Sequence, residues 1–159
     1  MKSIIFKGGV EVLFSEEGKD NHQARSVFKC IIPPRARTPM PHYHERFEES
    51  VKGVKGLATW VVNGETTQLG PGDSLVIPRG VTHYFANHTC EPVEFTCSIT
   101  PGVLGAEYFE DVASVVNVDG LPDFDKLREV MRNHGLVPML GIKQTIIFAI
   151  LGVIRKLKR

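Results

Sequence analysis

The chemistry-bearing residues concentrate in the stretch 41–49, which contains two histidines and ends in two glutamates. His42 and His44 are two positions apart, and alternate residues of an extended strand point to the same face. Their Cα atoms would then lie roughly 6 to 7 Å apart, so both imidazoles can reach one metal ion. Two histidines and one carboxylate, with coordination positions left open, form the ligand set of non-haem iron oxygenases. The stretch therefore predicts a metal site.

Either Glu48 or Glu49 can supply the carboxylate, because neighbours on a strand face opposite ways. If Glu48 faced inward, Lys52 would also face inward as an unpaired buried cation, which is costly. If Glu49 faces inward, the residues beside it on that face are Val51 and Gly53. This comparison favours Glu49.

A second stretch, 72–87, contains another histidine, His83. A short apolar strand at 75–77 ends in a turn formed by Pro78 and Gly80, and the chain then reverses into a strand that carries His83. On that strand His83 would share a face with Phe85 and Asn87. A nitrogen ligand with an apolar neighbour is therefore expected here.

The elements around these stretches are mostly strands. Apolar residues alternate with other residues at 10–15, 27–32 and 93–99, which is typical of strands that bury one face. Asn63-Gly64 between apolar runs predicts a tight hairpin. From about Gly105 the apolar period becomes helical, at 109–116, 124–131 and about 141–158. We therefore expect an all-β fold, with a barrel at 1–104 and a helical C-terminal extension at 105–159 in the same domain.

The two stretches resemble the two motifs of the cupin superfamily. The first motif has a glycine, the histidine pair, a glutamate and a second glycine, and His42, His44, Glu49 and Gly56 match it, whereas Ala36 stands at the leading glycine. The second motif is matched at every fixed position, by the residues Gly72, Pro78, Gly80, His83 and Asn87. The fifteen residues between Gly56 and Gly72 match the short spacing of small microbial cupins.

The resemblance implies a double-stranded β-helix, the jelly-roll barrel made of two antiparallel sheets. It implies inward-facing metal ligands at His42, His44, Glu49 and His83. Similar sites bind one divalent transition metal: iron, manganese, nickel, zinc or copper. In dioxygenases of this superfamily the glutamate often accepts a proton as well, so the resemblance gives Glu49 a catalytic role.

Three functions are consistent with these residues. The first is a quercetinase-like, metal-dependent oxygenase that acts on a small oxygen-rich or aromatic substrate, with Val51, Gly53 and Phe85 lining the pocket. The second is a redox-neutral metalloenzyme: an isomerase, lyase or cyclase. The third is a non-catalytic module that binds a small molecule or a metal. We rank the oxygenase first, because the open ligand set favours catalysis.

The remaining residues are expected to have structural roles. We expect His22, His88 and His134 to lie in loops or away from the site, Tyr43 and Trp60 to pack or to line the rim, and Asp73 and Arg79 to serve turns. Arg79 at the barrel mouth, holding an anionic substrate, is the alternative. The widely spaced Cys30, Cys90 and Cys97 form no metal or disulfide pattern, and Cys30 and Cys97 are expected to be buried thiols.

Composition and the ends of the chain bear on partners. A formal net charge of +1 without a long basic stripe gives no reason to expect nucleic acid. The N-terminus has too short an apolar run for a signal peptide, so a cytoplasmic location is expected. The apolar arc at 146–157 ends in a basic cluster and predicts a helix that packs on the barrel or in a homodimer. The alternative for this helix is contact with an anionic membrane surface.

Overall fold

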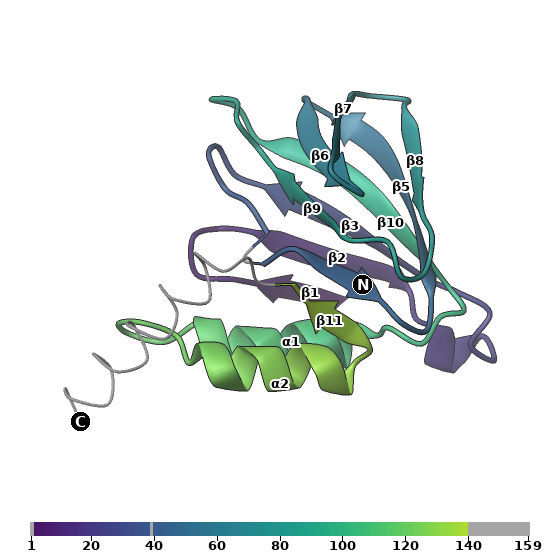
Figure 1. The fold of residues 1–159 in the computed structure, drawn as a ribbon, viewed down its shortest axis with the longest axis vertical. Coiled ribbons are helices and arrows are strands. Elements are labelled where there is room, and N and C mark those ends of the chain that lie inside the picture. The colour runs from purple at the N-terminus through teal and green to yellow at the C-terminus, as the bar shows by residue number, and fades with distance from the viewer. Residues whose placement is uncertain (1, 39, 140–159) are drawn as a thin grey trace.

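The computed structural model describes residues 2–38 and 40–139, which form two antiparallel β-sheets facing each other with two helices alongside (Figure 1). One sheet has six strands, in the order β1 (Lys2–Ile5), β2 (Glu11–Glu16), β3 (Ser26–Ile32), β10 (Val93–Thr100), β5 (Glu48–Lys55) and β8 (Ser74–Ile77). The other has five, in the order β11 (Leu136–Pro138), β4 (His42–His44), β9 (His83–Ala86), β6 (Ala58–Val62) and β7 (Glu65–Leu69). The predicted all-β barrel with C-terminal helices is confirmed.

The core lies between the sheets and is filled by alternate strand residues. Phe28, Cys30 and Ile32 of β3 are buried, and the intervening residues are only partly covered. On β10 the buried positions include Phe95 and Cys97, as the period of two predicts. Cys30 and Cys97 are free buried thiols, whereas Cys90 is free and exposed.

The predicted hairpin at Asn63-Gly64 joins β6 to β7. Both residues have positive φ angles, 51° and 83°, which is the backbone of a tight type I′ turn. The turn sets the register in which Trp60 pairs with Thr67, so the indole of Trp60 faces the interior, where it is 1% exposed.

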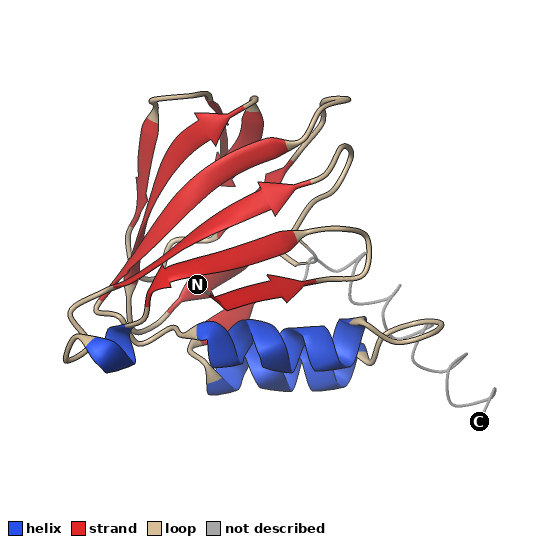
Figure 2. Ribbon diagram, turned by 180° about the vertical axis from the view of Figure 1, so that it is seen from behind, coloured by secondary structure: helices blue, strands red, loops and turns tan. Residues whose placement is uncertain are grey.

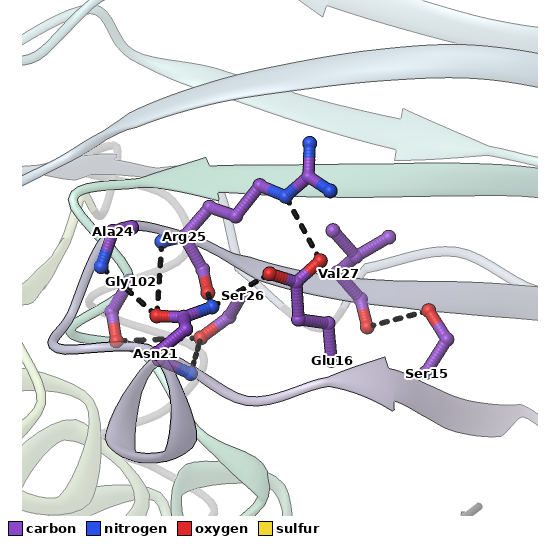
Figure 3. Close-up of polar contacts among 9 residues, drawn as sticks. Ser15, Glu16, Asn21, Ala24, Arg25, Ser26, Val27 and Gly102 are labelled. Atoms are coloured by element: carbon purple, nitrogen blue, oxygen red, sulfur yellow. Dashed lines mark hydrogen bonds and ion pairs between the residues drawn. The ribbon is translucent and has the colours of Figure 1, made fainter.

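A polar cluster closes the end of the six-stranded sheet where β2 passes into β3 through the short helix Gly18–Asp20 (Figure 3). The amide of Asn21 donates to the Glu16 carboxylate and to the Arg25 carbonyl, and Glu16 also binds the Arg25 guanidinium at 2.9 Å. Beside them, the Ser26 hydroxyl donates to the carbonyl of Gly102. The cluster therefore ties the start of β3 to the segment that follows β10.

The two helices pack together along the β1 side of the barrel (Figure 2). Helix α1 (Ala106–Val116) buries Tyr108, Val112 and Val115. Helix α2 (Phe124–Asn133) begins at Asp123, whose side chain accepts a hydrogen bond from the Lys126 amide, as expected of an N-cap.

The extension also contains a strand that the helical pattern did not predict. After α2 and Gly135, strand β11 pairs antiparallel with β4, the strand of the two histidines. The expected helix at 141–158 and its basic end lie outside the described residues. Among the described helices, none has the length and apolar character needed to span a membrane.

Candidate metal centre

His42 and His44 lie on the same inward face of β4, as their spacing predicts. They are 8% and 2% exposed, and Tyr43 between them is only partly buried. β4 is held on both edges, because β11 pairs with it from Leu136 to Pro138 and His42 pairs with His83 of β9. The turn before β9 is also tied to this strand, since the amide of Gly80 donates to the His44 carbonyl at 2.9 Å.

The glutamate comes from the opposite sheet. Glu49 on β5 is 8% exposed, whereas Glu48 and Lys52 are exposed to solvent. The choice of Glu49 as the inward carboxylate is therefore correct, and Lys52 avoids burial as the argument required. Among the described residues, Glu49 has the only buried carboxylate.

The structure brings the four predicted residues together. One nitrogen from each of the rings of His42, His44 and His83 lies within 4.8 Å of the other two. The Glu49 Oε2 atom is 3.5 Å from the His83 Nε2 atom and 3.8 Å from the His44 Nε2 atom. Both distances exceed the roughly 2.8 Å of a charge-assisted hydrogen bond, so the carboxylate is not closely paired with either ring.

Backbone carbonyls orient two of the rings. The Nδ1–H of His42 donates to the Met40 carbonyl at 3.1 Å, and the Nδ1–H of His83 donates to the Val81 carbonyl at 3.0 Å. A neutral ring that donates from Nδ1 has its lone pair on Nε2, so these contacts leave both Nε2 atoms free to bind a metal. His44 differs, because its buried Nδ1 has no partner among the described residues; its ring stacks on Phe47 at 4.2 Å.

The protonation states also suit a metal. Burial, followed by the effect of His83, lowers the pKa of His42 to about 4, and burial lowers the pKa of His44 to about 3 despite the attraction of Glu49. Burial would raise the pKa of Glu49, but the nearby rings of His83 and His44 outweigh it and lower that pKa to about 2. At neutral pH His42 and His44 are therefore neutral and Glu49 is ionised, the forms that bind metals.

The donor set fits a divalent transition metal. A buried carboxylate without a close cationic partner is unfavourable, and a metal ion among the imidazoles would neutralise it. Three nitrogens and one oxygen suit iron, manganese, nickel, zinc or copper, whereas calcium and magnesium prefer oxygen ligands. The three histidines can thus hold a metal, with Glu49 beside them.

An aromatic layer lies against the site. Trp60 stacks on His83 with ring centroids 6.4 Å apart and an interplanar angle of 19°. Phe85 and Phe95 each lie within 5.3 Å of Trp60 and 5.0 Å of each other. Phe85, expected on the face of His83, packs against Trp60, and Trp60, expected to pack or to line the rim, is fully buried beside His83.

Two buried groups near Glu49 were not predicted as part of the site. Burial, with the charge of Glu49 adding to it, raises the pKa of the Tyr108 phenol above its usual range, so this hydroxyl of α1 stays protonated. The Cys97 thiol, two positions from the residue that pairs with Glu49, also interacts with that carboxylate. Sequence reasoning treated Cys97 as a buried thiol and did not single out Tyr108, because periodicity shows which face is buried but not what lies opposite.

Other singled-out residues have structural roles. The Asn87 amide donates to the carbonyls of Ile32, Pro33 and Glu91, so this motif residue organises a loop. Asp73 accepts from the Gly70 amide, as expected of a turn residue. The remaining histidines stay outside the site, as expected: His22 and His88 are exposed, and His134 binds the Asp111 carboxylate at 2.8 Å.

Comparison with known families identifies the barrel. Residues 28–99 match the family described as "Cupin domain", a segment that includes the three histidines and Glu49. No curated protein sequence matches the chain significantly. A cupin protein from Bacteroides fragilis is 25% identical, with a TM-score of 0.46, and the match spans 65% of that protein and 48% of this chain.

Two further solved structures share the fold. A predicted oxalate decarboxylase from Thermotoga maritima has a TM-score of 0.56 and 22% identity, over 62% of this chain and 90% of that protein. A sugar phosphate isomerase of the cupin superfamily from Silicibacter pomeroyi has a TM-score of 0.52 and 23% identity, over 62% of this chain and 68% of that protein. Identities this low support the shared fold alone. The family match over residues 28–99, which carry the site, therefore identifies that part of the chain as a cupin domain, and the solved structures share its fold.

Proposed function

We propose that this cupin binds one divalent transition metal through His42, His44, Glu49 and His83 and acts as a metal-dependent oxygenase on a small oxygen-rich or aromatic substrate. The observation that carries the proposal is the convergence of three buried imidazoles and one buried carboxylate from two facing sheets. A metal bound there would supply a Lewis-acid centre and, if redox-active, an electron-transfer centre for dioxygen chemistry.

The residues around the ligands support oxygenase chemistry over redox-neutral chemistry. An isomerase or lyase often pairs a carboxylate base with a second carboxyl group as the acid, but Glu49 is the only buried carboxylate among the described residues. An oxygenase needs only one proton acceptor. The aromatic layer of Trp60, Phe85 and Phe95 is suited to a flat substrate and helps to exclude water.

Glu49 has two roles in this proposal. As a ligand it must be ionised, and its low pKa ensures this at neutral pH. As a proton acceptor it would take a proton from a substrate hydroxyl. Glu49→Gln separates the two roles, because the amide oxygen can still face the metal but cannot accept a proton in the same way. We expect this variant to retain more metal than Glu49→Ala and to lose turnover.

Dioxygen uptake tests the oxygenase proposal. Protein reconstituted with iron, manganese, nickel or copper should consume dioxygen with at least one member of a panel of flavonols, catechols and 1,3-diketones, and zinc-loaded protein should not. Equal turnover with zinc and without dioxygen would favour the redox-neutral metalloenzyme. Ligand binding without any product would favour a non-catalytic binding module.

A further inference from the structure

The indole of Trp60 is a buried hydrogen-bond donor without an acceptor. Trp60 is 1% exposed, and its Nε1–H has no hydrogen-bond partner among the described residues. Buried polar groups in folded proteins are nearly always paired, so an unpaired indole N–H calls for an explanation. A ligand that supplies the missing acceptor would provide one.

The position of Trp60 places this donor in the compartment of the metal site. Trp60 pairs with Phe85, and Val62 pairs with His83, so Trp60 and His83 are diagonal neighbours on the inner face of one sheet. Their rings stack with centroids 6.4 Å apart, and Phe95 of the opposite sheet lies against the indole at 5.3 Å. The indole therefore lies between the sheets, on the same inner face as the ring of His83.

The charge of the loaded site indicates the class of that molecule. A divalent ion with one carboxylate and neutral imidazoles retains one positive charge. Among the described residues, no other buried carboxylate is present to balance it. A small anion with an acceptor oxygen would satisfy both the metal charge and the indole donor, and the flanking phenylalanines favour a flat carbon skeleton.

We propose that Trp60 is a ligand-binding residue whose Nε1–H donates a hydrogen bond to an oxygen of a small organic anion bound beside His83. This inference rests on the proposed metal site. It assigns to Trp60 a specificity role, since ligands without an acceptor oxygen at that position would leave the indole unpaired.

The chain contains a single tryptophan, so the test can observe this donor directly. The ¹⁵N-labelled, zinc-loaded protein should give one indole N–H resonance. Benzoate serves as the anionic probe, and benzylammonium is the matched probe with the same ring but no acceptor. We expect benzoate to move the indole resonance downfield and benzylammonium to leave it in place.

Trp60→Phe removes the donor and keeps an aromatic ring. We expect calorimetry to show about tenfold weaker benzoate binding in this variant, with zinc affinity unchanged. The matched control, Phe85→Leu, alters the aromatic layer but keeps the donor, so benzoate should still move the indole resonance.

The outcomes separate this inference from the proposed function. Zinc binding without benzoate binding would overturn the inference alone. Benzoate binding that leaves the indole resonance unmoved, or that is equally tight in Trp60→Phe, would also overturn it alone. A wild-type protein that binds no zinc would overturn the metal site and this inference together.

Discussion

At the scale of single residues, His42 and His44 are neutral because the fold buries them. His42 and His44 have pKa values lowered to about 4 and about 3, against about 6.5 in an unfolded chain. At a pH between the folded-state and unfolded-state pKa values, these two histidines bind protons in the unfolded chain but not in the folded protein. The metal-free protein should therefore lose stability as the pH falls through 6.5, and this loss should continue until the folded-state pKa values are reached.

We predict that the free energy of unfolding of the chelator-treated protein falls by about 2 kcal/mol for each of these two histidines between pH 7 and pH 5. Urea denaturation at the two pH values measures the change. In the His42→Gln variant, the fall in the free energy of unfolding should be about half as large. Replacing the exposed His88 by Gln should leave the fall unchanged. The same stability at both pH values would show that the rings are not held neutral. Because its pKa is lowered on folding, Glu49 causes a further loss of folding stability only below about pH 4.5.

The residue pattern predicted those parts of the site that depend on strand alternation. The period of two placed His42 and His44 on one face and favoured Glu49 over Glu48, because each decision needs only a residue's neighbours on its own strand. The turn at Pro78 and Gly80, followed by a strand, indicated His83 as a further nitrogen ligand, and the motif resemblance agreed. The unpaired indole of Trp60 could not be predicted, since it depends on which groups the opposite sheet brings near it.

At the scale of elements, β11 links the helical extension to the metal site. The Gly135 carbonyl accepts from the amide of Glu45, next to His44, and β11 then pairs with β4. Gly135 has a φ of 82°, and a Cβ there would lie 2.7 Å from the Nε atom of Arg46, whose guanidinium donates to the Asn133 carbonyl. A side chain at this position would strain the connection from α2 to β11.

We predict that Gly135→Ala weakens zinc binding several-fold and lowers the free energy of unfolding by about 1–2 kcal/mol, the typical cost of a left-handed alanine. Gly120→Ala is the matched control, because Gly120 also has a positive φ, of 91°, but a Cβ there has open space. The control should lose similar stability and keep zinc affinity. Competition with a chromophoric chelator measures the affinity, and equal zinc binding by both variants would contradict the role of β11.

The elements were predicted where they are long and regular. The strands at 27–32 and 93–99 and the helices around 109–116 and 124–131 have clear apolar periods. β11 was missed because it has three residues, one of them a proline, and its stability comes from pairing with β4. Long-range pairing of this kind leaves no local signal.

At the scale of the whole molecule, a metal that binds the folded chain and not the unfolded chain must stabilise it. We predict that zinc at 100 times its dissociation constant adds about 2.7 kcal/mol to the free energy of unfolding. For a chain of this size that would raise the Tm by about 5–10 °C. Thermal scans with and without zinc measure the shift. His83→Ala should abolish it and His88→Ala should keep it, and a shift retained in His83→Ala would place the zinc elsewhere.

The assembly of the whole molecule remains a prediction. We expect a homodimer from the resemblance to small cupins and from the apolar arc at 146–157. Light scattering on the full chain should give a mass near twice 17.7 kDa. A mass of one chain at micromolar concentration would contradict the dimer without affecting the metal site.

The central claim is that His42, His44, Glu49 and His83 bind one metal ion. Its most direct test is the metal content of the protein purified without chelator or affinity nickel and measured by elemental mass spectrometry. The His42→Ala/His83→Ala double variant should be compared with a His22→Ala/His88→Ala control, in which only exposed histidines change. We predict about one transition metal per chain in the wild type and the control, and almost none in the site variant. No metal in the wild type after reconstitution, or equal metal in the site variant, would contradict the account.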